Sequence, residues 1–99
     1  MAEVVFRQQA WRDLEGIDKR IRDEDPGAAE RFRENILRRI GLLERFPEAA
    51  QPRPEFGHDI RTIPMGRYVV ILRVTVPKVT VLRILHGARD LPKLLGNLR

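Results

Sequence analysis

The sequence predicts an α+β fold of order β-α-α-β-β-β, an antiparallel sheet with a helical hairpin packed on one face. Two observations indicate this fold. The first half of the chain carries two apolar stripes with helical spacing, separated by residues 25–27. The second half carries three β-rich runs joined by very short connections. A chain of 99 residues rarely builds a second core, so we expect one domain over residues 1–99.

The first two elements are predicted to be a short strand and a helix. Val4, Val5 and Phe6 are β-branched or aromatic, as is typical of a strand. Over residues 8–23, apolar residues recur every three or four positions and predict one buried helix stripe: Ala10, Leu14, Ile17 and Ile21. Trp11 lies one step off this stripe, and we expect it in the core.

A second helix is predicted over residues 26–46. Asp25 can cap it through its carboxylate, and Pro26 suits the first helical position. Its stripe again steps by three or four: Ala29, Phe32, Ile36, Ile40 and Leu43. Because the connection is so short, the two helices must run antiparallel and cover a common surface. Phe32, Phe46 and Phe56 are expected to lie in the core or anchor a loop.

Three strands are predicted after a proline-rich loop that extends through residue 58. They span residues 60–65, 68–74 and 78–85, and their connections can join only antiparallel neighbours. If the first strand runs up and the two helices run down and up, all strands fit one antiparallel sheet. The last two runs are apolar on both parities, so both faces should be covered. The hairpin can cover one face, and a partner is one candidate for the other.

The composition limits the classes of function. The chain is 42% hydrophobic and 33% charged, which argues against disorder. A net charge of +5 favours an acidic partner, either nucleic acid or protein, although a solvated surface also accounts for it. The absence of cysteine excludes disulfides and thiol chemistry. No apolar run approaches the roughly 20 residues of a membrane span, and no signal-peptide pattern opens the chain. We therefore expect a cytoplasmic protein without membrane contact.

The sequence offers little for a metal or cofactor. The chain has two histidines, His58 and His86, and they are far apart without cysteine. A P-loop and a dinucleotide-binding glycine motif are both missing, and the lack of serine excludes a serine triad. No cofactor, no metal and no catalytic residue is therefore expected.

Arginines on the predicted strands are the first candidate binding residues. Arg61, Arg73 and Arg83 stand among Val and Ile. Three aligned guanidinium groups can bind phosphates or an acidic peptide. Ordinary exposed arginines that lie over apolar neighbours fit the pattern equally well.

His86 directly follows the last strand and is the second candidate. A titratable group at a strand end can act as an acid or a base. The alternative is a structural histidine whose ring nitrogens bond the backbone and fix the turn. We favour the structural interpretation because no tyrosine or second base is expected beside His86. Asp90 is predicted to cap a short helical tail over residues 91–95.

In order, these pieces resemble the ParE branch of the RelE/ParE toxin superfamily. The resemblance covers nearly the whole chain, and its most specific part is the closing Arg-x-x-His-Gly-Ala-Arg-Asp of residues 83–90. The other parts lie at residues 10–17, 25–29, 36–43, 46–47, 57–61 and 66–70. The family fold is the β-α-α-β-β-β arrangement that the residue patterns predict independently.

The resemblance implies a toxin of a type II toxin–antitoxin module. Toxins of this kind bind DNA gyrase and stall it on cleaved DNA, and they inhibit without being enzymes. The implied partner is a ParD-like antitoxin with a DNA-binding ribbon-helix-helix dimer and a C-terminal segment that wraps the toxin. Their complex would bind operator DNA through the antitoxin. Candidate antitoxin- or target-binding residues are then Arg61, Arg73, Arg83, His86 and Arg89.

Three questions stay open at this point. A RelE-like ribosome-dependent mRNA endonuclease is the first alternative, with Arg61 and Arg83 as cations and His86 as acid or base. Because RelE-like chains add a tyrosine or several lysines near the C-terminus, the ParE interpretation is favoured. A non-toxic basic module that binds nucleic acid is the second alternative. It is less favoured because no aromatic platform, on which bases could stack, accompanies the positive charge in this sequence. The tail from Leu91 to Arg99 fits either a packed cap or a gyrase contact.

Overall fold

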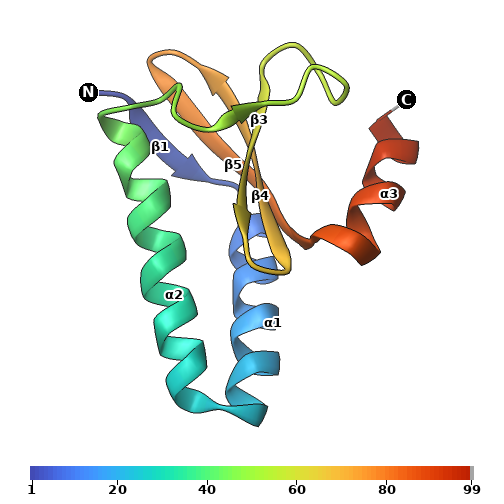
Figure 1. The fold of residues 1–99 in the computed structure, drawn as a ribbon. Helices are drawn as coiled ribbons and strands as arrows, with labels where there is room; N and C mark the ends of the chain where they lie inside the picture. Colours follow the sequence, from blue (N-terminus) through green and yellow to red (C-terminus); the bar gives the residue numbers. More distant parts are fainter. Residues whose placement is uncertain (99) are drawn as a thin grey trace.

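The computed structural model describes residues 1–98, with side chains described as far as Lys93. A five-stranded, mostly antiparallel sheet carries a helical hairpin on one face (Figure 1), which confirms the predicted α+β fold. The strands stand in the order β1-β5-β4-β3-β2. In sequence, the elements are β1 Glu3–Phe6, α1 Gln8–Glu24, α2 Pro26–Gly41, a 3-10 turn Leu42–Glu44, β2 Gln51–Pro52, β3 Ile60–Met65, β4 Tyr68–Thr75, β5 Lys78–His86 and α3 Gly87–Leu98.

The hairpin forms as its sequence predicts. Asp25 is the single residue between α1 and α2, and its carboxylate accepts a hydrogen bond from the Ala28 N–H at 3.1 Å. Pro26 begins α2 with its fixed φ. Arg22 donates to Asp18 one turn earlier and to Glu30 on α2, at 3.1 and 2.8 Å. The cap and these ion pairs fix the two helices side by side.

The two helix stripes form the main core, as predicted. They pack on the strand residues that face the hairpin, Ile63, Val70, Leu72, Val79, Val81 and Ile84. Six stripe residues are buried there, namely Ala10, Leu14, Ile17, Ile36, Ile40 and Leu43, while Ile21 and Phe32 are partly buried against them. The predicted second helix, residues 26–46, is too long at its C-terminal end. The α-helix α2 ends at Gly41, and the chain continues as the 3-10 turn.

Two aromatic residues differ from their predicted places. Phe46 is 59% exposed, so its assignment to the core or to a loop anchor is wrong; the chain leaves the hairpin at the 3-10 turn before reaching it. Trp11 is 37% exposed and stacks on Phe6 with ring centroids 4.2 Å apart. It shields the junction of β1 and α1 instead of entering the core. Phe56, by contrast, is buried.

The first strand corrects the predicted sheet. β1 pairs in parallel with β5, from Glu3 opposite Lys78 to Phe6 opposite Val81. The prediction of a fully antiparallel sheet assumed that the chain reverses after the first strand. Arg7 is the single residue between β1 and α1 and is extended, so the chain does not turn back along β1 before α1 begins (Figure 1). The remaining pairs of neighbouring strands are antiparallel, and β2 adds a short edge strand that the sequence did not indicate.

The second face of the sheet is covered by this chain itself. A smaller cluster of buried residues lies there: Phe56, Ile60, Val69, Ile71 and Leu85. Leu91 of α3 packs against this cluster, and Phe56 belongs to the loop between β2 and β3. Figure 1 shows α3 on the side of the sheet away from the hairpin. These segments cover residues for which the sequence had suggested a partner.

A β-bulge in β5 determines which residues face the hairpin. Ile71 pairs with Arg83 and Leu72 with Val81, so Leu82 is an extra residue in β5. Val79 and Val81 face the hairpin before the bulge, and Ile84 faces it afterwards. Strict alternation would have directed Arg83 into the apolar core. The bulge therefore keeps Arg83 out of the apolar core, and its side chain is partly exposed.

Candidate functional site

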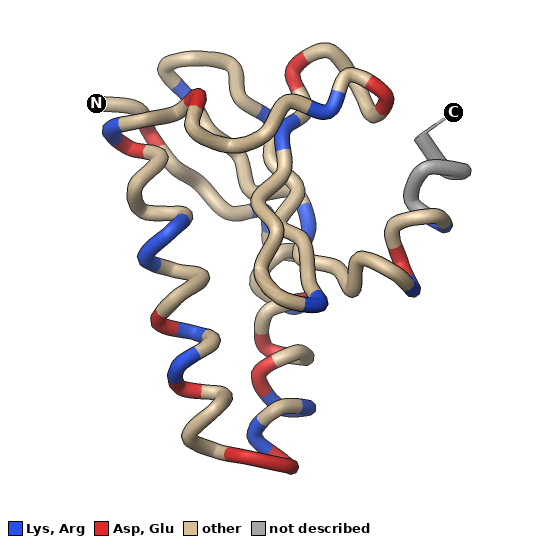
Figure 2. Tube along the Cα trace, in the orientation of Figure 1, with Lys and Arg blue, Asp and Glu red and all other residues tan. Residues whose placement is uncertain are grey.

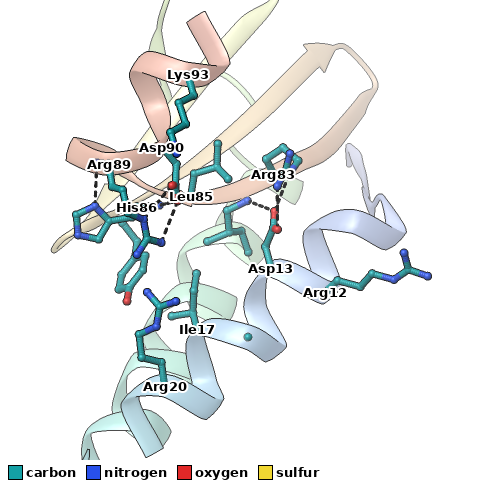
Figure 3. A pocket seen from close by; sticks show the side chains of 13 residues that line it. Arg12, Asp13, Ile17, Arg20, Arg83, Leu85, His86, Arg89, Asp90 and Lys93 are labelled. Carbon is teal, nitrogen blue, oxygen red and sulfur yellow. Dashed lines mark hydrogen bonds and ion pairs between the residues drawn. The ribbon is translucent and has the colours of Figure 1, made fainter. Parts of the chain in front are cut away.

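An open cavity of about 430 Å³ lies where α1, the end of β5 and the start of α3 meet (Figure 3). Three of the five sequence-predicted site residues line it, namely Arg83, His86 and Arg89. The cavity walls also carry cations that the sequence analysis did not single out: Arg12, Arg20 and Lys93. The two carboxylates in the wall are Asp13 and Asp90. Cationic side chains therefore outnumber carboxylates in the cavity.

Arg83 is fixed by Asp13 of α1. Nε and one terminal nitrogen of Arg83 donate to the two carboxylate oxygens at 2.8 and 3.1 Å, a bidentate pair. Asp13 also accepts from the backbone N–H of Ile84 at 3.0 Å. The Asp13 hydrogen bond is the main reason that the pKa of Arg83 lies above its ordinary value. Arg83 is thus a fixed cation, with 36% of its side chain exposed.

His86 caps α3. Its Nδ1 accepts a hydrogen bond from the Arg89 N–H at 3.1 Å, as an N-cap side chain does at the third helical residue. Asp90 reaches back and accepts from the His86 N–H at 3.1 Å. The two bonds form a reciprocal cap. The prediction that Asp90 caps a helix over residues 91–95 is wrong, because α3 begins at Gly87 and His86 occupies the capping position.

Arg89 and Asp90 form an ion pair at the mouth of the cavity. Nε of Arg89 lies 3.0 Å from one Asp90 oxygen, and a terminal nitrogen lies 3.2 Å from the other. The Arg89 hydrogen bond is the largest cause that lowers the pKa of Asp90 to about 2. Asp90 is therefore a carboxylate at neutral pH and accepts hydrogen bonds without supplying a proton.

Tyr68 lies beside His86, and the expectation that no tyrosine does so is wrong. Tyr68 begins β4 and pairs directly with His86 of β5 in the antiparallel register. The two rings meet edge to face with centroids 5.7 Å apart, and Tyr68 also packs edge to face on Phe32 of α2 at 5.4 Å. The sequence did not reveal the pair because the two residues are 18 positions apart in the chain. Only the register of β4 on β5 brings them together.

Arg61 and Arg73 lie outside the cavity and on opposite faces of the sheet, because Arg61 pairs with Leu72 of the main core and Arg73 with Ile60 of the smaller cluster. Arg61 donates to the backbone carbonyls of Glu48 and Ala50, both at 2.9 Å, and so ties the loop after α2 to β3. Arg73 lies 3.7 Å from Asp59, with 44% of its side chain exposed. The arginines of the three strands therefore do not form one row.

Arg12, Arg20 and Lys93 complete the basic wall of the cavity. Figure 3 shows Arg20 extending from α1 toward the His86 end, with Arg12 at the rim and Lys93 above on α3. Among the described residues, no carboxylate lies within ion-pair distance of these three cations. The 3.6-residue periodicity of a helix could have placed Arg12, Asp13 and Arg20 near one face of α1. It could not have placed that face against α3.

Other kinds of site find little support in the described part of the chain. No group of three or more acidic or histidine side chains there is arranged to hold a metal ion. No helix among the described residues has the length and apolarity to cross a membrane. In the tail, Leu91 packs on the second cluster, as a packed cap would do. The side chains of residues 94–99 lie outside the described residues.

The fold and the site define a small α+β protein with a basic cavity beside its sheet. Residues 4–91 match the family described as the ParE toxin of the type II toxin–antitoxin system parDE, and the chain belongs to this family. A solved structure of the chromosomal ParDE system from P. aeruginosa is similar in fold, with a TM-score of 0.73 and 20% identity. The match covers 87% of this chain and 96% of the other. No individually curated protein matches the chain.

Proposed function

We propose that this ParE-family toxin inhibits DNA gyrase by binding it and does not cleave RNA. The observation that carries the proposal is the state of the groups in the cavity. His86 uses Nδ1 to cap α3, and Asp90 is ionised and already engaged with Arg89. Arg83 is held by Asp13. Such groups form a fixed, charged surface, as binding requires, whereas general acid catalysis needs a group that can release a proton.

The test measures gyrase and ribosome activity with the same purified protein. We expect loss of negative supercoiling and accumulation of cleaved DNA, while ribosome-bound mRNA stays intact. Arg89→Glu, at the cavity mouth, should weaken the inhibition. Arg45→Glu removes the same charge from an exposed position outside the cavity and serves as the control. Full gyrase activity at saturating toxin would refute the proposed target.

An mRNA endonuclease is the second candidate, and the Tyr68–His86 pair is the observation that favours it. A tyrosine hydroxyl and a free Nε2 of His86, close to several arginines, form a set that can move a proton and hold a phosphate. Cleavage of mRNA on ribosomes that is lost in both His86→Ala and Tyr68→Phe would establish this activity. Tyr68→Phe keeps the ring packing and removes only the hydroxyl, so it separates chemistry from folding.

The partner that we propose for neutralisation is a ParD-like antitoxin with an acidic, amphipathic segment that folds on this toxin. The cations available to it are partly exposed: 44% for Arg73, 36% for Arg83 and 51% for Arg89. His86 and Arg61 complete the candidate set, with Arg61 already engaged by two carbonyls. The antitoxin dimer would carry the complex to operator DNA.

Charge reversal tests this interface. Arg73→Glu and Arg89→Glu should each raise the Kd for the antitoxin and make its salt dependence shallower, because attraction becomes repulsion at the reversed site. Arg45→Glu is again the matched control. Unchanged affinity in both reversals would place the antitoxin on a different surface.

A further inference from the structure

The cavity between α1, β5 and α3 holds more positive charge than the ion pairs of this chain neutralise. Five cationic side chains line it, and its two carboxylates are both engaged, Asp13 with Arg83 and Asp90 with Arg89. Arg12, Arg20 and Lys93 remain without a carboxylate partner among the described residues. A concave site with this excess of cations favours an anionic ligand.

The cavity differs in charge from the tip of the hairpin. Figure 2 shows acidic and basic residues interspersed along both helices, with acidic residues at the tip of the hairpin. That tip carries Asp23, Glu24 and Asp25 in sequence. The cavity, in contrast, gathers cations from three different elements (Figure 3), namely α1, β5 and α3. An anion would therefore be attracted to the cavity in preference to the hairpin tip.

The positions of the cations suit a phosphate. The guanidinium groups of Arg83 and Arg89 already hold Asp13 and Asp90, which leaves Arg12 and Arg20 of α1 and Lys93 of α3 for a ligand. A phosphate accepts hydrogen bonds around a tetrahedron, so it suits donors that arrive from separate walls. Arg20 approaches from α1 and Lys93 from α3.

The aromatic rings beside these cations indicate that the ligand is a phosphate attached to a nucleobase, as in a nucleic-acid strand, and not a free phosphate ion. Tyr68 and His86 line the same cavity, and their rings are adjacent. A nucleobase next to a bound phosphate can stack on such a ring or accept hydrogen bonds from its polar atoms. The volume of about 430 Å³ falls within the range of small-ligand sites, roughly 300–1,000 Å³.

We propose that this cavity is a binding site for the phosphodiester of a nucleic-acid strand, with Arg20 and Lys93 as its principal phosphate contacts. The site is independent of whether gyrase is the target. DNA and RNA strands carry the same phosphodiester, and the experiment below distinguishes them. Arg83 and Arg89 are held in place by their carboxylate partners and so fix the shape of the surrounding walls, while the excess positive charge comes from Arg12, Arg20 and Lys93.

The experiment measures binding of labelled short single-stranded DNA and RNA of equal length to the full chain across a series of salt concentrations. Replacing Arg20→Gln and Lys93→Gln together should weaken binding at least about tenfold, as expected for loss of charged hydrogen bonds. It should also reduce the slope of log Kd against log salt. The control replaces Arg45→Gln and Lys78→Gln, one Arg and one Lys at exposed positions outside the cavity, and should change Kd by less than about twofold.

Competition by inorganic phosphate tests the chemistry at the site itself. Phosphate should displace the strand from the parent, and stronger binding of one strand type identifies DNA or RNA as the source. The proposal is overturned if the two double variants weaken binding equally, since this would indicate diffuse attraction to the whole surface. It is also overturned if neither strand binds the free toxin. Supercoiling assays on the same variants report on gyrase separately, so either proposal can fail without the other.

Discussion

One oxygen of Asp13 lies 2.8 Å from Nε of Arg83 and 3.0 Å from the backbone nitrogen of Ile84. β1 pairs with β5 only as far as Val81, so the N–H of Ile84 lies beyond the end of the neighbouring strand. Asp13 supplies the acceptor that a longer β1 would have provided. One carboxylate therefore fastens α1 to the sheet and positions an arginine of the cavity.

Removing the Asp13 carboxylate should destabilise the fold. Asp13→Ala leaves the Ile84 N–H and the Arg83 guanidinium without their acceptor, and only 10% of the Asp13 side chain is exposed. We expect a loss of about 1–3 kcal/mol in the free energy of unfolding, measured by urea melts. Asp23→Ala is the control, since Asp23 is an exposed residue of the same helix without an ion pair among the described residues. Equal midpoints for the two variants would contradict this role.

Two adjacent leucines test the core. Leu43 is 1% exposed and packs in the main core, whereas Leu42 is 51% exposed. Leu43→Ala should cost about 2–5 kcal/mol because it leaves a cavity. The same truncation at Leu42 should cost less than about 0.5 kcal/mol. Urea melts of both variants check the difference, and similar losses would show that the end of the hairpin is packed differently.

The fold was predictable wherever local signals agreed. The stripe through Ile36 and Ile40 has helical spacing, and both residues are buried. Asp25 and Pro26 define the helix start by their own chemistry. Gly66 marks the β3–β4 turn, and its φ of +62° is a conformation that other residues adopt only with strain. Each signal lies within a few residues of the structure that it determines.

The candidate site was less predictable because it depends on long-range register. The extra residue Leu82 changes which side of β5 faces the hairpin, and a run that is apolar on both parities does not reveal a bulge. Tyr68 meets His86 only through pairing of β4 with β5. The direction of β1 depended on a single extended residue, Arg7. No local pattern encodes these three features.

Arg61 and Arg73 should differ in their effect on stability. Arg61 donates to two backbone carbonyls, those of Glu48 and Ala50, so Arg61→Ala leaves acceptors unpaired and should cost about 1–3 kcal/mol. The half-exposed pair of Arg73 and Asp59 should contribute at most about 1 kcal/mol, and Arg73→Ala should lose no more than that. Thermal or urea unfolding compares the two variants directly. A larger loss at Arg73 would reverse this ranking.

The cap of α3 should give the protein an acid-sensitive contribution to stability. The pKa of Asp90 is lowered from 3.8 to about 2, mainly by its hydrogen bond with Arg89. A depressed carboxyl pKa means that the unfolded chain binds the proton more readily than the folded one. The contribution is therefore complete above pH 3.8 and is lost as the pH falls through that value toward about 2.

Asp90→Asn isolates this contribution, because the amide does not titrate in this range while its oxygen can still accept from the His86 N–H. The difference in unfolding free energy between parent and variant should be largest near pH 5 and should shrink steadily as the pH falls toward 2. Urea melts at several pH values measure it, and Asp23→Asn provides a control on an exposed carboxylate. A difference that stays constant between pH 5 and pH 2 would show that Asp90 acts through its shape and hydrogen bonding, without a contribution from its charge.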